Sequence, residues 1–120
     1  MDTSHKGARN EEYTADYLRQ NGFRILEQNF RCKLGEIDII ASKGRVIHII
    51  EVKYRSNYRY GSPLSAVDYR KRKRVSNAAS YYMYCRRLPT DTPISFDVAA
   101  VSDRSIELYE NVFEYLGRYR

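Results

Sequence analysis

The chain of 120 residues is poor in cysteine and has no long apolar segment, and each absence excludes a class of protein. Its two cysteines, Cys32 and Cys85, form no CxxC pair and could make one disulfide at most. We interpret them as reduced thiols of a cytoplasmic protein. Together with two histidines at unsuitable spacings, they do not match a structural zinc site. No apolar run approaches the roughly 20 residues of a membrane span, and the N-terminus has no apolar signal region, so we expect neither membrane insertion nor secretion.

Tryptophan is also absent, whereas tyrosine occurs twelve times. Hydrophobic residues make up 42% of the chain and charged residues 30%, which is typical of a globular domain. No repeat, low-complexity tract or long linker divides the sequence. At this length we expect one domain over residues 1–120 with a single core.

The positive charge is concentrated in one segment. The formal net charge is +6 and the pI is about 9.4. Between residues 66 and 87 there are seven lysines and arginines and one acidic residue, Asp68, so this segment accounts for the whole surplus. A concentrated basic face suits a polyanion, because neutralised phosphates release their counterions. The segment therefore predicts a nucleic acid as partner, or else a solvated helix face that keeps the protein soluble.

Apolar spacing and turn residues predict two helices and four or five strands. Ala8, Ala15 and Leu18 lie on one face of the first helix, and Gly22 follows as a stop signal. The second helix has an apolar stripe at helical spacing. The members of this stripe are Val67, Val75, Ala78, Tyr82 and Cys85. The predicted elements are helices 6–20 and 63–86 and strands 23–30, 36–41, 46–53, 94–101 and 106–109.

The order of these elements predicts the fold class. Residues 46–53 are apolar on both faces, which favours a central place in the sheet. The first three strands should form an antiparallel meander, with a tight turn at residues 43–45. After a loop at 55–63, the second helix would make a right-handed crossover that leaves strands 46–53 and 94–101 parallel neighbours. We expect an α/β domain of three layers with a mixed sheet, in the order α-β-β-β-α-β.

Acidic side chains interrupt two of the apolar strands. Asp38 stands between two isoleucines, and Glu51 follows two more, with Lys53 two residues later. Because side chains alternate along a strand, Glu51 and Lys53 project from the same face and Val52 from the other. Adjacent carboxylates repel each other, and a divalent cation with oxygen ligands, Mg²⁺ or Mn²⁺, would relieve that repulsion. The alternative is a salt bridge of Lys53 with Glu51 or Asp38, without a metal.

The first helix offers a further acid. Glu11 and Glu12 flank its apolar stripe, and either one could reach the acidic end of the sheet. Each could equally have a capping or solvated role.

Four segments between Gly7 and Val101 resemble a known family. They are GARNEEYTADYLRQNGFRILEQNFRCKLGEIDIIA, IIEVKYR, GSPLSAVDYRKRKRV and SFDVAAV. Together they resemble the YraN-like family of small bacterial proteins. That family is similar to archaeal Holliday junction resolvases and to the restriction-endonuclease-like superfamily with its PD-(D/E)-x-K active site. The resemblance implies a single nuclease-like domain with a restriction-endonuclease-like three-layer α/β/α fold.

The resemblance also implies roles for individual residues. Asp38 and Glu51 match the metal carboxylates, joined by the carbonyl of Val52, and Lys53 matches the catalytic lysine. Glu12 matches the helical acid, because it stands three residues before an alanine, as in the pattern G-E-x-x-A. This sequence has glutamate where that pattern has glycine.

Further matches concern phosphate binding and the fourth strand. Arg55 follows the lysine as in EVK-x-R and could hold a phosphate. Asp97 matches an R-F-D segment, but Ser95 stands where the arginine is expected, which puts any pair built on that arginine in doubt. The basic residues assigned to nucleic-acid binding, of which Lys71 matches a family lysine, are Arg70, Lys71, Arg72, Lys73 and Arg74. In the loop, Tyr58 and Tyr60 could stack on an unpaired base, or simply reflect abundant tyrosine.

The implied activity is that of a metal-dependent endonuclease with Mg²⁺ or Mn²⁺, which hydrolyses phosphodiester bonds in DNA, branched DNA included. The alternative is a non-catalytic nucleic-acid-binding or interaction module on the same fold, because fold similarity alone does not establish chemistry. A homodimer is a further possibility, since a symmetric four-way junction needs two active sites.

Overall fold

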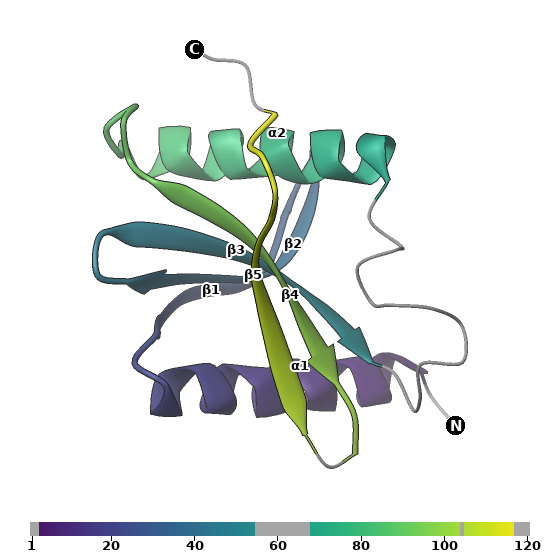
Figure 1. The fold of residues 1–120 in the computed structure, drawn as a ribbon. Helices are drawn as coiled ribbons and strands as arrows, with labels where there is room; N and C mark the ends of the chain where they lie inside the picture. The colour runs from purple at the N-terminus through teal and green to yellow at the C-terminus, as the bar shows by residue number, and fades with distance from the viewer. Residues whose placement is uncertain (1–2, 55–67, 104, 117–120) are drawn as a thin grey trace.

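The protein is built on one five-stranded sheet with a helix against each face (Figure 1). The computed structural model describes residues 3–54, 68–103 and 105–116. Within this part of the chain no helix combines the length and apolar character needed to cross a membrane. The elements are α1 (Thr3–Gln20), β1 (Arg24–Cys32), β2 (Gly35–Lys43), β3 (Val46–Tyr54), α2 (Tyr69–Cys85), β4 (Ile94–Val101) and β5 (Ile106–Phe113).

The sheet is mixed and has the order β1-β2-β3-β4-β5. The strands β1, β2 and β3 form an antiparallel meander, β3 and β4 are parallel, and β4 and β5 are antiparallel. The predicted α/β class, the central place of β3 and the parallel pair that follows it are therefore confirmed. The last strand is longer than predicted and extends to Phe113.

The second helix begins later than predicted. Its N-cap is Asp68, whose backbone is extended and whose carboxylate accepts a 2.8 Å hydrogen bond from the Lys71 N–H. A side chain that caps the helix in this way fixes its start, so α2 begins at Tyr69 and not at Pro63. Residues 55–67 lie outside the described residues, and with them the predicted loop at 55–63 and Val67.

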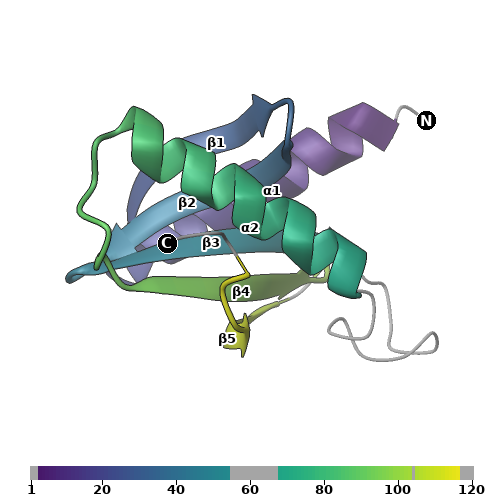
Figure 2. The ribbon, with the colours of Figure 1, turned by 90° about the horizontal axis from the view of Figure 1, so that it is seen from above.

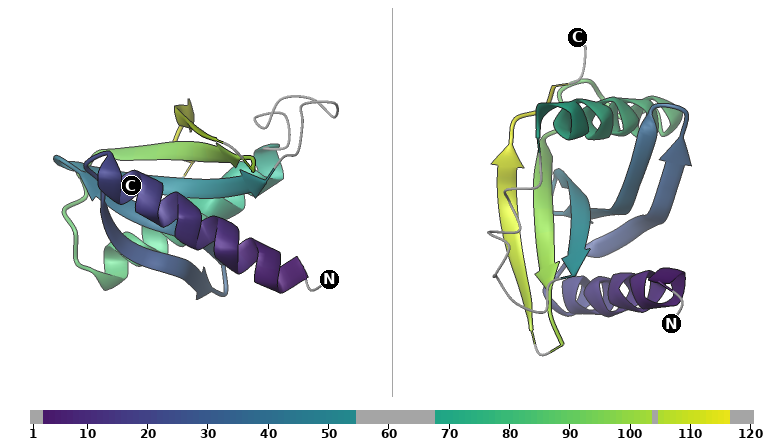
Figure 3. Two further views of the ribbon diagram at one scale, coloured as in Figure 1. Left: turned by 90° about the horizontal axis from the view of Figure 1, so that it is seen from below. Right: turned by 90° about the vertical axis from the view of Figure 1, so that its right-hand side faces the viewer.

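Two apolar layers hold the helices to the sheet. The right-hand view of Figure 3 shows α1 and α2 on opposite faces of the sheet. Each large aliphatic side chain that is fully buried contributes about 1.5–3 kcal/mol. The layer under α2 consists of Ile37, Ile40, Ile47, Ile49, Val75, Ala78, Ala79, Tyr82, Met83 and Phe96. The layer over α1 consists of Ala15, Leu18, Phe23, Ile39, Ala41, Ile50 and Ala99. The prediction that Cys85 belongs to the apolar stripe of α2 is wrong, because Cys85 is exposed at the end of the helix.

The helix α2 passes close over the start of β2, and Gly35 makes this approach possible. Its φ is +156°, and a Cβ at this position would lie 3.1 Å from the backbone oxygen of Arg74. Figure 2 shows α2 lying obliquely across the strands. Both helices begin at the same end of the sheet, where β2 starts and β3 ends (Figures 1 and 2). The first turns of α2 therefore stand over this end.

Candidate active site

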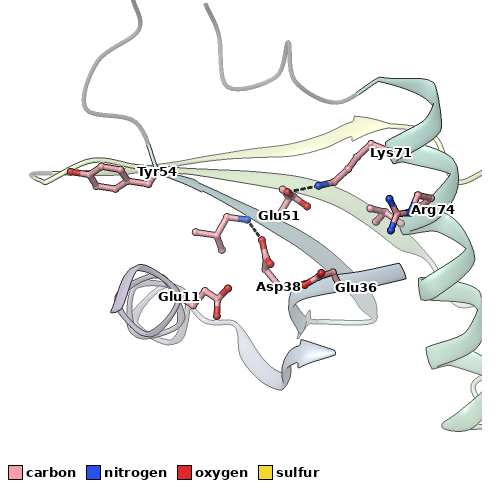
Figure 4. Close-up of a pocket in the computed structure, with 9 residues that line it drawn as sticks. Glu11, Glu36, Asp38, Glu51, Tyr54, Lys71 and Arg74 are labelled. Carbon is pink, nitrogen blue, oxygen red and sulfur yellow. Dashed lines mark hydrogen bonds and ion pairs between the residues drawn. The ribbon is translucent and has the colours of Figure 1, made fainter. Parts of the chain in front are cut away.

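A cavity of about 410 Å³ lies at this end of the sheet. Four acids from three elements line it, together with two cations from α2, and Figure 4 shows these side chains directed at the common space. The lining residues are Glu11 of α1, Glu36 and Asp38 of β2, Glu51, Val52 and Tyr54 of β3, and Lys71, Arg74 and Val75 of α2. The sheet thus delivers Asp38 and Glu51 to one place.

Asp38 and Glu51 meet because the β2–β3 ladder ends beside them. Ile39 opposite Ile50 is the last pair of that ladder at this end. Beyond it the carboxylate of Asp38 accepts a 2.8 Å hydrogen bond from the backbone N–H of Val52 (Figure 4). This bond fixes Asp38 beside the strand that carries Glu51.

The surroundings of Asp38 disfavour negative charge. Burial and the neighbouring Glu51 raise the pKa of Asp38 from 3.8 to about 6, and Glu11 acts in the same direction. The hydrogen bond from Val52 lowers the pKa and only partly offsets these effects. A cation placed among these carboxylates would relieve the unfavourable charge.

Glu51 lies between two ammonium groups. One of its carboxylate oxygens is 2.9 Å from Nζ of Lys71 and 3.4 Å from Nζ of Lys53. Only 18% of its side chain is exposed, against 22% for Lys53 and 40% for Lys71. The pairing of Glu51 with Lys53 agrees with one alternative from the sequence, while Lys71, assigned there to nucleic-acid binding, faces the cavity from α2.

The helical acid at the cavity is Glu11 and not Glu12. Glu12 is exposed and lies 3.7 Å from the guanidinium of Arg19, outside the cavity lining. Successive residues of a helix point about 100° apart, so only one of the two can face the sheet. The buried residues Ala15 and Leu18 follow Glu11 by four and seven positions, which places all three on one face. That spacing was present in the sequence and could have identified Glu11.

The remaining basic residues fall into three groups. Arg74 lines the cavity, whereas Arg70 and Lys73 are exposed and outside its lining. Arg72 is half-buried, with its guanidinium 6.0 Å from the ring centre of Tyr69. Three residues that the sequence assigned to nucleic-acid binding or stacking, Arg55, Tyr58 and Tyr60, lie outside the described ranges. Sequence reasoning missed Glu36 and Tyr54, because nothing in a strand pattern tells which polar residue near its end lines a cavity.

A second polar cluster joins β3, β4 and β5. The carboxylate of Asp97 accepts hydrogen bonds from Nδ1 of His48 at 2.6 Å, from Oγ of Ser95 at 2.6 Å and from the N–H of Asn111 at 3.0 Å. Ser95 thus partners Asp97 at the position where the resemblance implied an arginine. His48, Asp97 and Glu110 have ligand atoms within 4.8 Å of one another. Because both Asp97 oxygens already accept from donors, we interpret the cluster as a buried hydrogen-bond network.

Comparison with known proteins places this architecture in a family. The model of the uncharacterised protein family UPF0102 matches residues 10–101, a range that runs from the middle of α1 to the end of β4 and includes every residue lining the cavity.

Individual relatives match over nearly their whole length. A UPF0102 protein of Lachnoclostridium phytofermentans is 40% identical over 117 residues, which cover 98% of this chain and 99% of the relative. A UPF0102 protein of Thermodesulfovibrio yellowstonii is 44% identical over 107 residues, with 89% and 94% covered. One of Clostridioides difficile is 45% identical over 101 residues, with 84% and 88% covered. The family resemblance found in the sequence is confirmed, and the chain belongs to the YraN-like family UPF0102.

Proposed function

We propose that this protein is a metal-dependent endonuclease that hydrolyses phosphodiester bonds in DNA. One observation carries the proposal: Asp38 and Glu51 reach the same cavity from neighbouring strands, with Lys53 beside Glu51. A half-buried pair of carboxylates costs stability unless cations offset its charge, and carboxyl groups in such surroundings are concentrated at functional sites.

The donor set fits a divalent cation with oxygen ligands. Asp38 and Glu51, with the backbone carbonyl of Val52, would hold Mg²⁺ or Mn²⁺. Burial and the neighbouring Glu51, which raise the pKa of Asp38, both favour a cation bound between the two carboxylates. When bound, the ion polarises the phosphate and lowers the pKa of a coordinated water.

The chain's own residues supply the other requirements of hydrolysis. Lys53 can orient the attacking water or offset the charge that develops on the phosphate oxygens. Lys71 and Arg74 reach the cavity from α2, where they can hold a phosphate of the substrate. Glu11 adds a further acid from α1 that can bind a second cation or its water shell. The hydrogen bond from Val52 holds Asp38 in place for this role.

The proposal extends to the fold and the setting. A mixed sheet with one helix on each face supports a restriction-endonuclease-like three-layer α/β/α arrangement of a single nuclease-like domain. The basic first turns of α2 support DNA as partner. We place the activity in the cytoplasm, because the chain has few cysteines and no long apolar segment. Two copies of the protein would be needed to cut both strands of a symmetric junction.

The test is cleavage of branched, flapped and single-stranded DNA with Mg²⁺ or Mn²⁺, with RNA of the same sequence in parallel. We expect Asp38→Asn and Lys53→Met each to lower cleavage by at least about a hundredfold. The matched control is Glu12→Gln, which leaves cleavage unchanged because Glu12 points away from the cavity. Cleavage that survives both substitutions would come from a contaminant and would contradict this site.

The second candidate is a binding module without turnover. It is favoured by one observation, the double pairing of Glu51 with Lys53 and Lys71, which satisfies that carboxylate without a metal. DNA binding that persists in the wild type together with an absence of cleavage under every metal condition would support the module over the nuclease.

A further inference from the structure

The outward face of α2 is lined differently from its buried face. The residues buried against the sheet are Val75, Ser76, Ala78, Ala79, Tyr82 and Met83. On the opposite side of the helix, Arg70, Lys73, Tyr81 and Tyr84 are all exposed. Their spacings of three, eight and three residues return to one side of an α-helix, so they form a single outward stripe.

The stripe begins with positive charge that no acid on α2 balances. From Tyr69 to Arg87 the chain has seven lysines and arginines and no aspartate or glutamate. Lys71 is paired with Glu51, and Arg86 with Glu27 of β1. Within the described ranges, Arg70 and Lys73 make no ion pair, so they remain available to an anionic partner.

The stripe ends in two exposed tyrosines, of which Tyr81 has one side of its ring near Phe30 of β1, at 6.3 Å between ring centres. Tyr84 is 80% exposed and Tyr81 is 43% exposed. A ring that is 80% exposed adds little to the core, although a buried aromatic would stabilise it. Tyrosine rings beside unbalanced positive charge form the combination that binds unpaired nucleotides, whose bases stack on the rings while their phosphates meet the cations.

We propose that this outward stripe of α2 binds an unpaired strand of nucleic acid, with its phosphates on Arg70 and Lys73 and its bases on Tyr81 and Tyr84. The inference rests on the proposed function for the choice of DNA as ligand. From Arg70 to Tyr84 the stripe is roughly 21 Å long, enough for several nucleotides. Its basic end adjoins Lys71 and Arg74 at the cavity, so the strand would lead away from the proposed site of cleavage.

The chemistry selects this ligand over the nearest rivals. In a duplex the base faces are stacked inside the helix, so the tyrosines would have nothing to stack on. A protein partner would need acidic side chains opposite the two cations and flat or apolar groups opposite the two rings. A nucleotide strand offers a phosphate and a flat base in every unit. The stripe therefore predicts a preference for substrates with a single-stranded arm, such as a flap.

The experiment measures binding in EDTA, where no metal-dependent cleavage can occur. The probes are a fluorescein-labelled 20-nucleotide oligothymidylate and a blunt duplex of the same length, followed by fluorescence anisotropy. We expect Tyr81→Ala with Tyr84→Ala to weaken binding of the single strand at least about tenfold, with duplex binding unchanged. Arg70→Gln with Lys73→Gln should weaken both probes and reduce the salt dependence by about one to two ion equivalents.

Two controls separate stacking from other effects. Tyr84→Phe keeps the ring and loses the hydroxyl, so it should bind within about twofold of the wild type. Tyr13→Ala removes an exposed tyrosine from α1, on the other face of the sheet, and should change nothing. Circular dichroism should show that each variant is folded, because the substituted positions are exposed.

The proposal is overturned if the double tyrosine variant binds the single strand like the wild type. It is also overturned if that same variant loses single-strand and duplex binding to the same extent. A partner protein that binds this stripe in place of nucleic acid would also overturn it. If the protein binds the oligothymidylate through the tyrosines but cleaves no DNA, the proposed nuclease activity is contradicted and the binding role of the stripe is supported.

Discussion

At the scale of single residues, Asp38 combines burial with a negative charge. Its pKa is raised to about 6, above the ordinary value of 3.8, so the folded state holds the proton more tightly than the unfolded chain. The charged form therefore costs stability, and this cost grows as the pH rises from 3.8 to about 6 and is complete above that value.

Asp38→Asn should therefore stabilise the metal-free protein at pH 7.5 by about 1–3 kcal/mol, because an asparagine oxygen can still accept the Val52 N–H without the charge. Urea unfolding in EDTA measures the difference. It should shrink as the pH is lowered through 6 towards 3.8, where the wild-type carboxyl becomes protonated. A variant less stable than the wild type at pH 7.5 would contradict this account of the site.

Asp97 lies in the opposite situation, since donors surround its charge. Asp97→Ala should cost about 2–4 kcal/mol in urea unfolding, because it leaves buried donors of His48 and Ser95 without an acceptor. Asp97→Asn keeps one acceptor and should lose roughly half as much. A loss below about 1 kcal/mol for the alanine variant would show that water replaces the carboxylate.

At the scale of elements, the seating of α2 on β2 depends on Gly35. Gly35→Ala would add a Cβ 3.1 Å from the Arg74 carbonyl, in a backbone conformation that alanine rarely adopts. We expect a loss of about 1–3 kcal/mol and displacement of Lys71 and Arg74 from the cavity. Gly44→Ala is the control, since it also has positive φ but open space around it. Equal losses for the two variants would mean that strain alone, without contact to α2, is responsible.

The elements also show how far sequence reasoning reaches. Strand periodicity identified β2 and β3, and the intervening helix predicted the parallel β3–β4 pair, because these patterns depend on local burial. The predicted start of α2 was wrong. Pro63 and Asp68 both suit the start of a helix, and the choice between them depends on the capping contact of Asp68. Lys71 as partner of Glu51 requires two elements 20 residues apart to meet, which no local pattern contains.

At the scale of the whole molecule, the cavity joins α1, β2, β3 and α2, so a ligand bound there stabilises the entire fold. At ten times its Kd, a cation that binds only the folded protein adds about 1.4 kcal/mol, which corresponds to several degrees in Tm. Mn²⁺ should therefore raise the Tm of the wild type, and Asp38→Asn with Glu51→Gln should abolish the rise. An equal rise in that variant would place the cation elsewhere.

The two edge strands of the sheet, β1 and β5, are both irregular. In β1 the register shifts between Ile25 and Glu27, and β5 has extra residues opposite Phe96 and Val98, where Asn111 has a φ of 56°. Such bulges twist an edge strand away from the flat geometry that a strand of another molecule would need for pairing. Crowded copies of this protein should thus resist joining into fibrils. If two copies do assemble on a four-armed substrate, these bulges disfavour a continuous sheet across the interface.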